Sequence, residues 1–211
     1  MYAAVGVASS ASAASRSRTG VWATKPLLMP VLAAFTLAAA GDSDAAGDGK
    51  KAVRLPAAGM ALSGLGDIAL AGPDAWFVPG MGAFAAAHAC YITALARGGA
   101  ARGVRPRVAA GYVALWAVLI AVLWRGLGSL RVPVAAYSLL LVAMAIMASG
   151  RNRAATAGGA LFVVSDALIA CGLAGISLLP RQESAVMPTY VAAQFLLAAG
   201  YLRPQRDPAA P

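Results

Sequence analysis

The chain of 211 residues is 60% hydrophobic and only 12% charged, with a mean hydropathy of +0.72. Since a soluble domain carries about 25% charged residues, this composition predicts an integral membrane protein. The net charge of +9 does not indicate nucleic-acid binding, because the basic residues lie in short stretches between apolar segments and form no continuous face. Cys90 and Cys171 both lie inside apolar segments without a CxxC spacing, which favours two buried thiols over a disulfide.

Several apolar stretches reach or approach the ~20 residues that a membrane-spanning helix needs. We therefore predict an all-α fold, a polytopic membrane bundle of about eight transmembrane helices. In chain order the predicted spans cover residues 2–15, 26–40, 53–71, 75–96, 108–124, 131–149, 154–179 and 184–202.

The N-terminal region differs from the rest of the chain. Residues 2–15 are rich in Ala and Ser, and the basic residues Arg16 and Arg18 follow this apolar run. A signal peptide has its positive charge before the run, and an acid-poor start rich in Ser and Arg also resembles a transit peptide. We interpret the stretch as a short first transmembrane helix. The expected organisation is a weak first segment and loop over 1–24, a polytopic membrane domain over 25–203 and a tail, disordered by composition, over 204–211.

The aspartates are the first candidates for function. The chain has only eight acidic residues, and two of them, Asp67 and Asp166, lie inside membrane-length apolar stretches. A charged side chain in the bilayer costs roughly 2.5–3.5 kcal/mol, so such residues normally face a cavity or a partner. As a pair they could act as general acid and general base, one protonated and one ionised. The alternative is a structural role, in which each aspartate hydrogen-bonds a neighbouring helix.

Further polar residues could surround the aspartates. His88 is the only histidine, so it cannot form a zinc site alone, but it could orient a carboxylate or a substrate. Lys25 stands where the second predicted span enters the membrane and is either an ordinary interfacial lysine or a cation for a lipid phosphate. The remaining candidates for a polar cavity are Tyr91, Tyr137, Ser165, Tyr190 and Gln194. No P-loop or GxSxG motif is present, and we predict no metal and no cofactor.

Weak internal similarity relates the two halves of the chain. AAFTL at 33–37 returns as AAYSL at 135–139, and both aspartates end a Gly-x-Ala-Leu-x-x-x-x-Asp pattern, 99 residues apart. Met81, Phe84 and His88 have the same spacing as Met187, Tyr190 and Gln194. Chance matches are common in Ala-rich sequence. Two parallel four-helix halves would place both aspartates at similar depth near the axis between them.

An ordered set of motifs resembles the lysoplasmalogenase (YhhN-like) family of small integral membrane proteins. The motifs extend over about 25–200, nearly the whole chain, and the N-terminal segment is shorter and more polar than the family's first helix. They are KPLLMP at 25–30, GDIAL at 66–70, GMGAFAAAHACYI at 80–92, YSLL at 137–140, GALFVVSDALIA at 159–170 and YVAAQFLLAAG at 190–200.

The resemblance implies eight helices and hydrolysis of the vinyl ether bond of lysoplasmalogens, with a lysophospholipid substrate taken from within the bilayer. Asp67 and Asp166 could supply the proton donor and the water-activating carboxylate that this reaction needs. An alternative function is a small proton-coupled transporter, in which the same aspartates relay protons. Broken helices would favour a transporter, and Pro133 and Pro188 are candidates for breaks, though both lie near helix starts. A structural subunit without chemistry is a third alternative.

The distribution of Lys and Arg predicts the orientation. Eleven lie on the side that carries the C-terminus and six on the other side, and the richer side is expected to be cytoplasmic. The expected location is a bacterial inner membrane with a cytoplasmic C-terminus. A reporter fused after Pro211 should therefore behave as cytoplasmic, and one inserted at 72–74 as external; an external C-terminal reporter would reverse the assignment.

Overall fold

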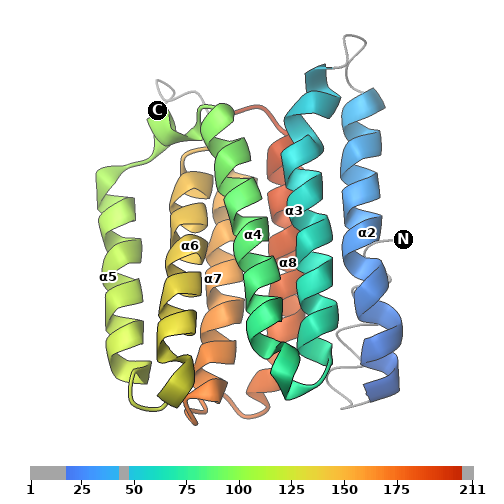
Figure 1. The fold of residues 1–211 in the computed structure, drawn as a ribbon. Helices are drawn as coiled ribbons and strands as arrows, with labels where there is room; N and C mark the ends of the chain where they lie inside the picture. The colour runs from blue at the N-terminus through green and yellow to red at the C-terminus, as the bar shows by residue number, and fades with distance from the viewer. Residues whose placement is uncertain (1–17, 43–47, 206–211) are drawn as a thin grey trace.

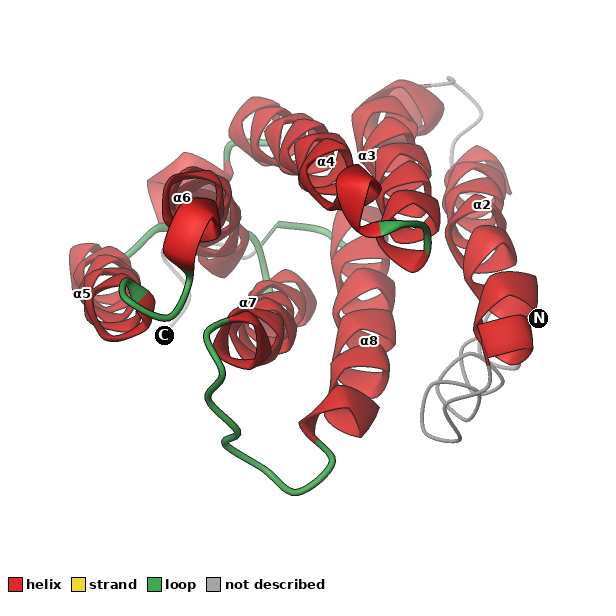
Figure 2. Cartoon of the chain, turned by 60° about the horizontal axis from the view of Figure 1, so that its bottom comes forward, coloured by secondary structure: helices red, strands yellow, loops and turns green. Residues whose placement is uncertain are grey.

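The computed structural model describes residues 18–42 and 48–205, which form helices and connecting turns without any strand. Figure 1 shows the long helices running side by side, and Figure 2 shows the bundle from one end. The long helices are α2 (Arg18–Asp42), α3 (Asp48–Ala71), α4 (Phe77–Arg97), α5 (Pro106–Leu123), α6 (Arg131–Ser149), α7 (Arg153–Leu173) and α8 (Gln182–Leu202). Short 3-10 helices precede α4, α5 and α6: η1 (Asp74–Trp76), η2 (Ala100–Gly103) and η3 (Gly128–Leu130).

The all-α prediction is confirmed, and the described helices match seven of the eight predicted spans. The predicted first span, residues 2–15, lies outside the described residues. Five helical segments, containing α4 to α8, are long and apolar enough to cross a membrane, and Leu28–Gly41 of α2 forms a shorter apolar stretch. α3 is not among the five. Its first two turns contain Lys50, Lys51 and Arg54, which lower its hydropathy. The composition therefore supports an integral membrane protein, and within the described residues this measure finds five of the predicted spans.

Two predicted helix ends are wrong. α2 begins at Arg18, eight residues before the predicted start of the second span at residue 26. α7 ends at Leu173 and not at 179, because Gly175 adopts a left-handed conformation with φ 75°. The Gly175 N–H donates to Gly172 O and the Ile176 N–H to Cys171 O, the hydrogen-bond pattern that commonly ends helices at glycine.

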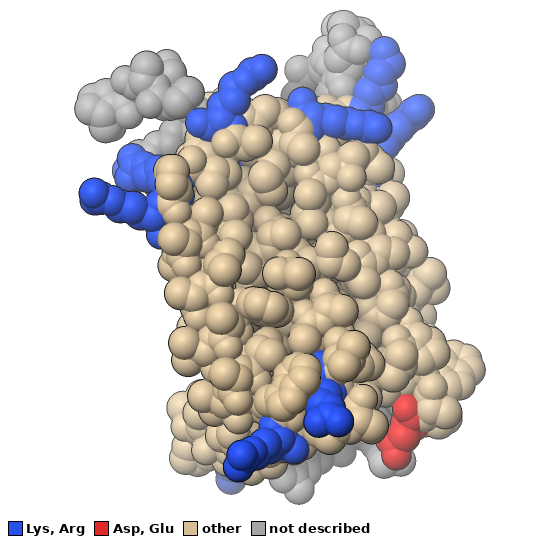
Figure 3. Space-filling view, turned by 60° about the vertical axis from the view of Figure 1, so that its left-hand side comes forward, with Lys and Arg blue, Asp and Glu red and all other residues tan. Residues whose placement is uncertain are grey.

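The helices differ in how much surface they bury. α7 packs most extensively on α8, and α3 packs on both α4 and α2, whereas α5 lies at the edge of the bundle and packs mainly on α6 (Figure 2). Leu123 is the one buried residue of α5. Figure 3 shows, on one face, Lys and Arg at the two ends of the molecule and a wide uncharged band between them. Such a band fits an apolar bilayer bounded by polar headgroups.

Glycines allow the closest helix contacts. A methyl group on Gly59 of α3 would lie 2.5 Å from the Tyr91 ring of α4, and one on Gly158 of α7 would lie 2.8 Å from Leu197 N of α8. Small residues at such points let membrane helices approach until their backbones touch. The two glycines are 99 residues apart and their two partners 106 apart, which are also the separations of the matched motifs.

A second pair of contacts follows the same separations. Gly66 of α3 approaches the Gly80 carbonyl of α4, and Ser165 of α7 donates to the Val186 carbonyl of α8 at 3.1 Å. The α3–α4 and α7–α8 pairs therefore share one packing register. This agreement is what duplication of one half of the chain would produce, and superposition of the two halves would test it.

Gly158→Ala should destabilise the protein, because the added methyl meets the Leu197 N and the Ala193 O atoms of α8, which belong to backbone and cannot rotate away. Overpacking of this kind costs about 1–3 kcal/mol. Thermal unfolding in detergent measures the change. Gly111→Ala in α5 is the matched control, since nothing lies within 4 Å of a methyl group there; equal stability of the two variants would contradict close packing at Gly158.

Candidate active site

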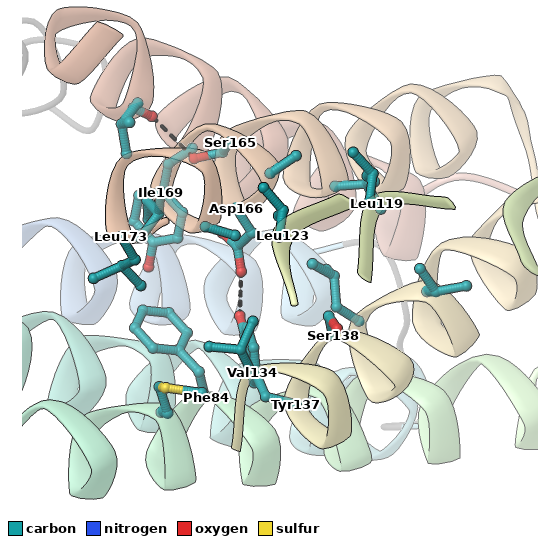
Figure 4. A pocket seen from close by; sticks show the side chains of 18 of the residues that line it. Phe84, Leu119, Leu123, Val134, Tyr137, Ser138, Ser165, Asp166, Ile169 and Leu173 are labelled. Atoms are coloured by element: carbon teal, nitrogen blue, oxygen red, sulfur yellow. Dashed lines mark hydrogen bonds between the residues drawn. The ribbon is translucent and has the colours of Figure 1, made fainter. Parts of the chain in front are cut away.

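A cavity of about 130 Å³ lies among α4, α5, α6, α7 and α8, and the last turns of α3 also contribute to its wall. Asp67 and Asp166 both line it, and Figure 4 shows Asp166 among the lining side chains. Most of the wall is apolar, with side chains such as Leu119, Leu123 and Val134. The structure thus places the two aspartates, which are 99 residues apart in sequence, at one cavity.

Asp67 is buried and belongs to a chain of polar side chains. It lies on α3 with 4% of its surface exposed, and its Oδ2 accepts a hydrogen bond of 2.8 Å from the Tyr190 hydroxyl of α8. Gln194 Nε2, one turn further along α8, donates to the same hydroxyl at 3.3 Å. Gln194 Oε1 in turn accepts from the Tyr91 hydroxyl of α4 at 3.0 Å. These hydrogen bonds connect three helices, and they hold the Tyr190 hydroxyl with its proton toward the Asp67 carboxylate.

Asp166 has a separate phenol partner. It lies on α7 and accepts a short hydrogen bond from the Tyr137 hydroxyl of α6, drawn as a dashed line in Figure 4. The neighbouring Ser165 turns toward α8 and bonds the Val186 carbonyl, so it holds the helix pair together and does not contact the carboxylate by a hydrogen bond. Asp166 is half-buried, in contrast to Asp67. Each aspartate therefore has its own tyrosine but a different degree of enclosure.

His88 lies between the two tyrosine–aspartate pairs. Its side chain is fully buried, and Nδ1 is 2.6 Å from the Phe84 carbonyl, which requires a proton on Nδ1. The ring packs edge-to-face on Tyr137 and Phe162, with centroid distances of 5.5 and 4.9 Å. Nε2 has no hydrogen-bond partner among the described residues. His88 is not part of the cavity wall. Its ring contact orients Tyr137, and it would not touch a molecule bound in the cavity.

The structure brings most of the predicted site residues together. Five of them line the cavity: Asp67, Tyr137, Ser165, Asp166 and Tyr190. Tyr91, Gln194 and His88 lie behind that wall. Lys25 belongs to α2, whose described side chains do not line the cavity, and the Lys25 side chain itself lies outside the described part. Trp116 of α5 was not predicted; its indole N–H donates to Ser138 on α6 at 3.0 Å beside the cavity. Its position within an apolar run gave no signal.

Among the described residues, no group of three or more His, Cys, Asp or Glu side chains comes close enough to hold a metal ion. The chemistry of the site is that of two carboxylates, two phenols and an otherwise apolar cavity. Carboxylates in such a site can exchange protons with a bound molecule, and the phenols can orient them.

The fold and the site together define a helical membrane protein with a carboxylate pair facing an apolar cavity. The chain belongs to the YhhN family, whose family model matches residues 20–201.

Curated relatives carry a functional name. The protein named lysoplasmalogenase TMEM86B of Homo sapiens is 35% identical over 144 residues, 68% of this chain and 62% of that protein. Its namesake in Sus scrofa is 34% identical over 170 residues, 81% of this chain and 71% of that protein. The namesake in Rattus norvegicus is 31% identical over 144 residues, 68% of this chain and 60% of that protein. No solved structure matches the chain significantly.

Gln194→Leu should lower the free energy of unfolding by about 1–3 kcal/mol, the usual result of leaving a buried polar group without its partner. The change removes the acceptor of the Tyr91 hydroxyl and the donor to the Tyr190 hydroxyl. Unfolding in detergent measures the loss. Thr93→Val is the control, because the Thr93 hydroxyl bonds only its own helix at an exposed position and its loss should change stability by less than about 0.5 kcal/mol. Equal losses in the two variants would show that the buried hydrogen bonds of Gln194 do not contribute to the free energy of unfolding.

Proposed function

We propose that this protein is a membrane-embedded hydrolase that cleaves the vinyl ether bond of lysoplasmalogens, or of a related ether lysolipid, to a fatty aldehyde and a glycerophospho-alcohol. The main support is that Asp67 and Asp166 line one cavity whose wall is otherwise mostly apolar. The names of the curated relatives agree with this reaction. The substrate would come from within the bilayer, in keeping with the apolar helices around the cavity.

The reaction needs a proton donor and a group that activates water. A carboxylic acid protonates the alkene carbon distal to the ether oxygen, which gives an oxocarbenium ion. The second carboxylate stabilises the cation and accepts a proton from the water that adds to it, as in glycoside hydrolysis. The resulting hemiacetal loses its hydroxyl proton to a carboxylate and collapses to the aldehyde, while the leaving alkoxy oxygen takes up a proton. One water is consumed, and the protons return to their starting groups.

The different surroundings of the two aspartates suit two different roles. Asp67 is enclosed and tied to Tyr190, and Asp166 is half-buried and tied to Tyr137. Carboxyl groups in unlike environments can hold different protonation states at one pH, which an acid–base pair requires. The phenol of each tyrosine orients its partner toward a fixed side of the cavity.

The transporter alternative receives less support. Its sequence argument was the possibility of broken helices at Pro133 and Pro188. α8 continues through Pro188, and Pro133 lies in the first turn of α6. Neither proline interrupts a helix at the depth of the aspartates.

Asp67→Asn and Asp166→Asn should each reduce turnover by ~10² or more, because the amide keeps the size of the side chain but cannot transfer a proton. Aldehyde release from a lysoplasmalogen by purified protein in detergent measures turnover. Asp74→Asn is the control, since Asp74 is exposed in η1 and does not line the cavity. His88→Ala should reduce turnover less than either aspartate variant, because His88 contacts Tyr137 and not the cavity.

A near-native rate in one folded asparagine variant would remove that aspartate from the mechanism. Near-native rates in both, or no aldehyde from the unaltered protein, would refute the proposed hydrolysis. Proton uptake by proteoliposomes would then test the transporter alternative.

A further inference from the structure

α3 and α7, the helices that carry the two aspartates, both end at the bottom of Figure 1. Asp67 is four residues before Ala71, the last residue of α3, and Asp166 is seven before Leu173, the last of α7. At 1.5 Å per residue, the carboxylates lie about 6–10 Å inside that end. This depth corresponds to the region just below the headgroups of a bilayer and not to its centre.

The cavity extends from the aspartates toward the middle of the membrane. Its wall includes Leu115, eight residues before the end of α5, and Leu141, ten residues after the start of α6. These residues lie about 12–15 Å from the same end. The part of the cavity beyond the carboxylates is therefore apolar and points along the direction in which a lipid chain runs.

Basic side chains stand at the end of the bundle that is nearest to the aspartates. Arg125 follows α5 and Arg131 begins α6, and no acidic residue lies between them in sequence. The Arg131 guanidinium stacks 5.7 Å from the centre of the Trp124 ring. Trp124 is exposed and does not line the cavity, so the stacking holds the guanidinium at the end of the bundle where α5 ends and α6 begins. Arg131 is six residues, about 9 Å along α6, from Tyr137, the partner of Asp166.

We propose that Arg131, assisted by Arg125, binds the phosphate of the lysolipid substrate. The inference rests on the proposed function and adds to it the position and headgroup class of the substrate. In a lysophospholipid, five bonds separate the ether oxygen from phosphorus, a span of about 6 Å when extended. A phosphate at the Arg131 end therefore places the vinyl ether at the depth of the carboxylates, and the chain continues toward Leu115 and Leu141. Guanidinium groups bind phosphate through paired hydrogen bonds, and they do so better than single ammonium groups.

This arrangement assigns phosphate binding to Arg131. α2 packs on α3 and α8, and none of its described side chains lines the cavity. The lipid would stand upright, with its headgroup in the leaflet on the side of the α5–α6 connection. The enzyme would therefore distinguish a phosphate-bearing ether lipid from the same lipid without its headgroup.

Arg131→Gln should lower kcat/KM for a lysoplasmalogen by about 10-fold, the equivalent of one lost charge-assisted hydrogen bond of roughly 1.5 kcal/mol. The same variant should leave kcat/KM unchanged for the matched 1-alkenylglycerol, which has the same vinyl ether and chain but no phosphate. Arg131→Lys should restore part of the loss, because it keeps the charge. Arg102→Gln, in η2 at the opposite end of the bundle, should be neutral with both substrates.

An equal loss with both substrates would overturn the proposal, because it would show a structural role for Arg131. An unchanged rate with lysoplasmalogen would overturn it as well. If the unaltered protein hydrolyses neither substrate, the proposed function fails, which is a distinct result.

Binding without turnover provides a second readout. A saturated 1-alkyl lysophospholipid cannot be hydrolysed by alkene protonation, and it should raise the thermal unfolding temperature of the unaltered protein more than 1-alkylglycerol does. Arg131→Gln should remove that difference. Inorganic phosphate at the same concentration should not reproduce the stabilisation, since the proposed site binds a phosphate attached to a chain; stabilisation by phosphate alone would instead indicate a free-anion site.

Discussion

The burial of two carboxyl groups among apolar helices is the constraint on which the rest of the structure depends. A polar group in such a setting must find partners, because the lipid offers none. Asp67 finds the Tyr190 hydroxyl on α8, and Asp166 finds the Tyr137 hydroxyl on α6. Tyr190 is 123 residues from Asp67 in sequence, so this single hydrogen bond joins the first part of the chain to the last. The chemistry of the site and the cohesion of the bundle thus depend on the same contacts.

These contacts require helices that approach one another closely. Gly59 gives room to the Tyr91 ring, and Gly66 gives room to the Phe84 ring. Larger residues would push α4 away from α3 and move the Tyr91 hydroxyl, which must reach Gln194 on α8. Small residues at these positions allow close helix packing. That packing in turn allows the hydrogen bonds that lead from Tyr91 through Gln194 and Tyr190 to Asp67. α5 has no such contacts and stays at the edge of the bundle, where it covers the cavity without being buried.

The sequence predicted the helices and the aspartates for a clear physical reason, since apolar length and intramembrane charge are both local properties. The predicted ends of α2 and α7 were wrong, although Gly175 in the turn after α7 is an ordinary stop signal. The sequence could not predict which tyrosine donates a hydrogen bond to which aspartate. A pair such as Tyr190 and Asp67 depends on the rotation and depth of helices that are far apart in sequence. The position of Arg131 at the same end of the bundle as the aspartates was not predictable for the same reason, because it depends on where α5 ends and α6 begins relative to them.

The matched motifs and the site differ in an informative way. The motifs align Phe84 with Tyr190 and Phe35 with Tyr137, so each tyrosine that bonds an aspartate corresponds to a phenylalanine in the other half. Phe84 still packs near the site, edge-to-face on Tyr190 at 6.0 Å, whereas Phe35 is exposed. The backbone register of the two helix pairs is shared, but the hydroxyl groups occur only in the second half. A symmetric arrangement would give the two carboxyl groups equal surroundings, and an acid and a base need unequal ones. The asymmetry at these aromatic positions therefore gives Asp67 and Asp166 the unlike surroundings that the proposed acid–base mechanism requires.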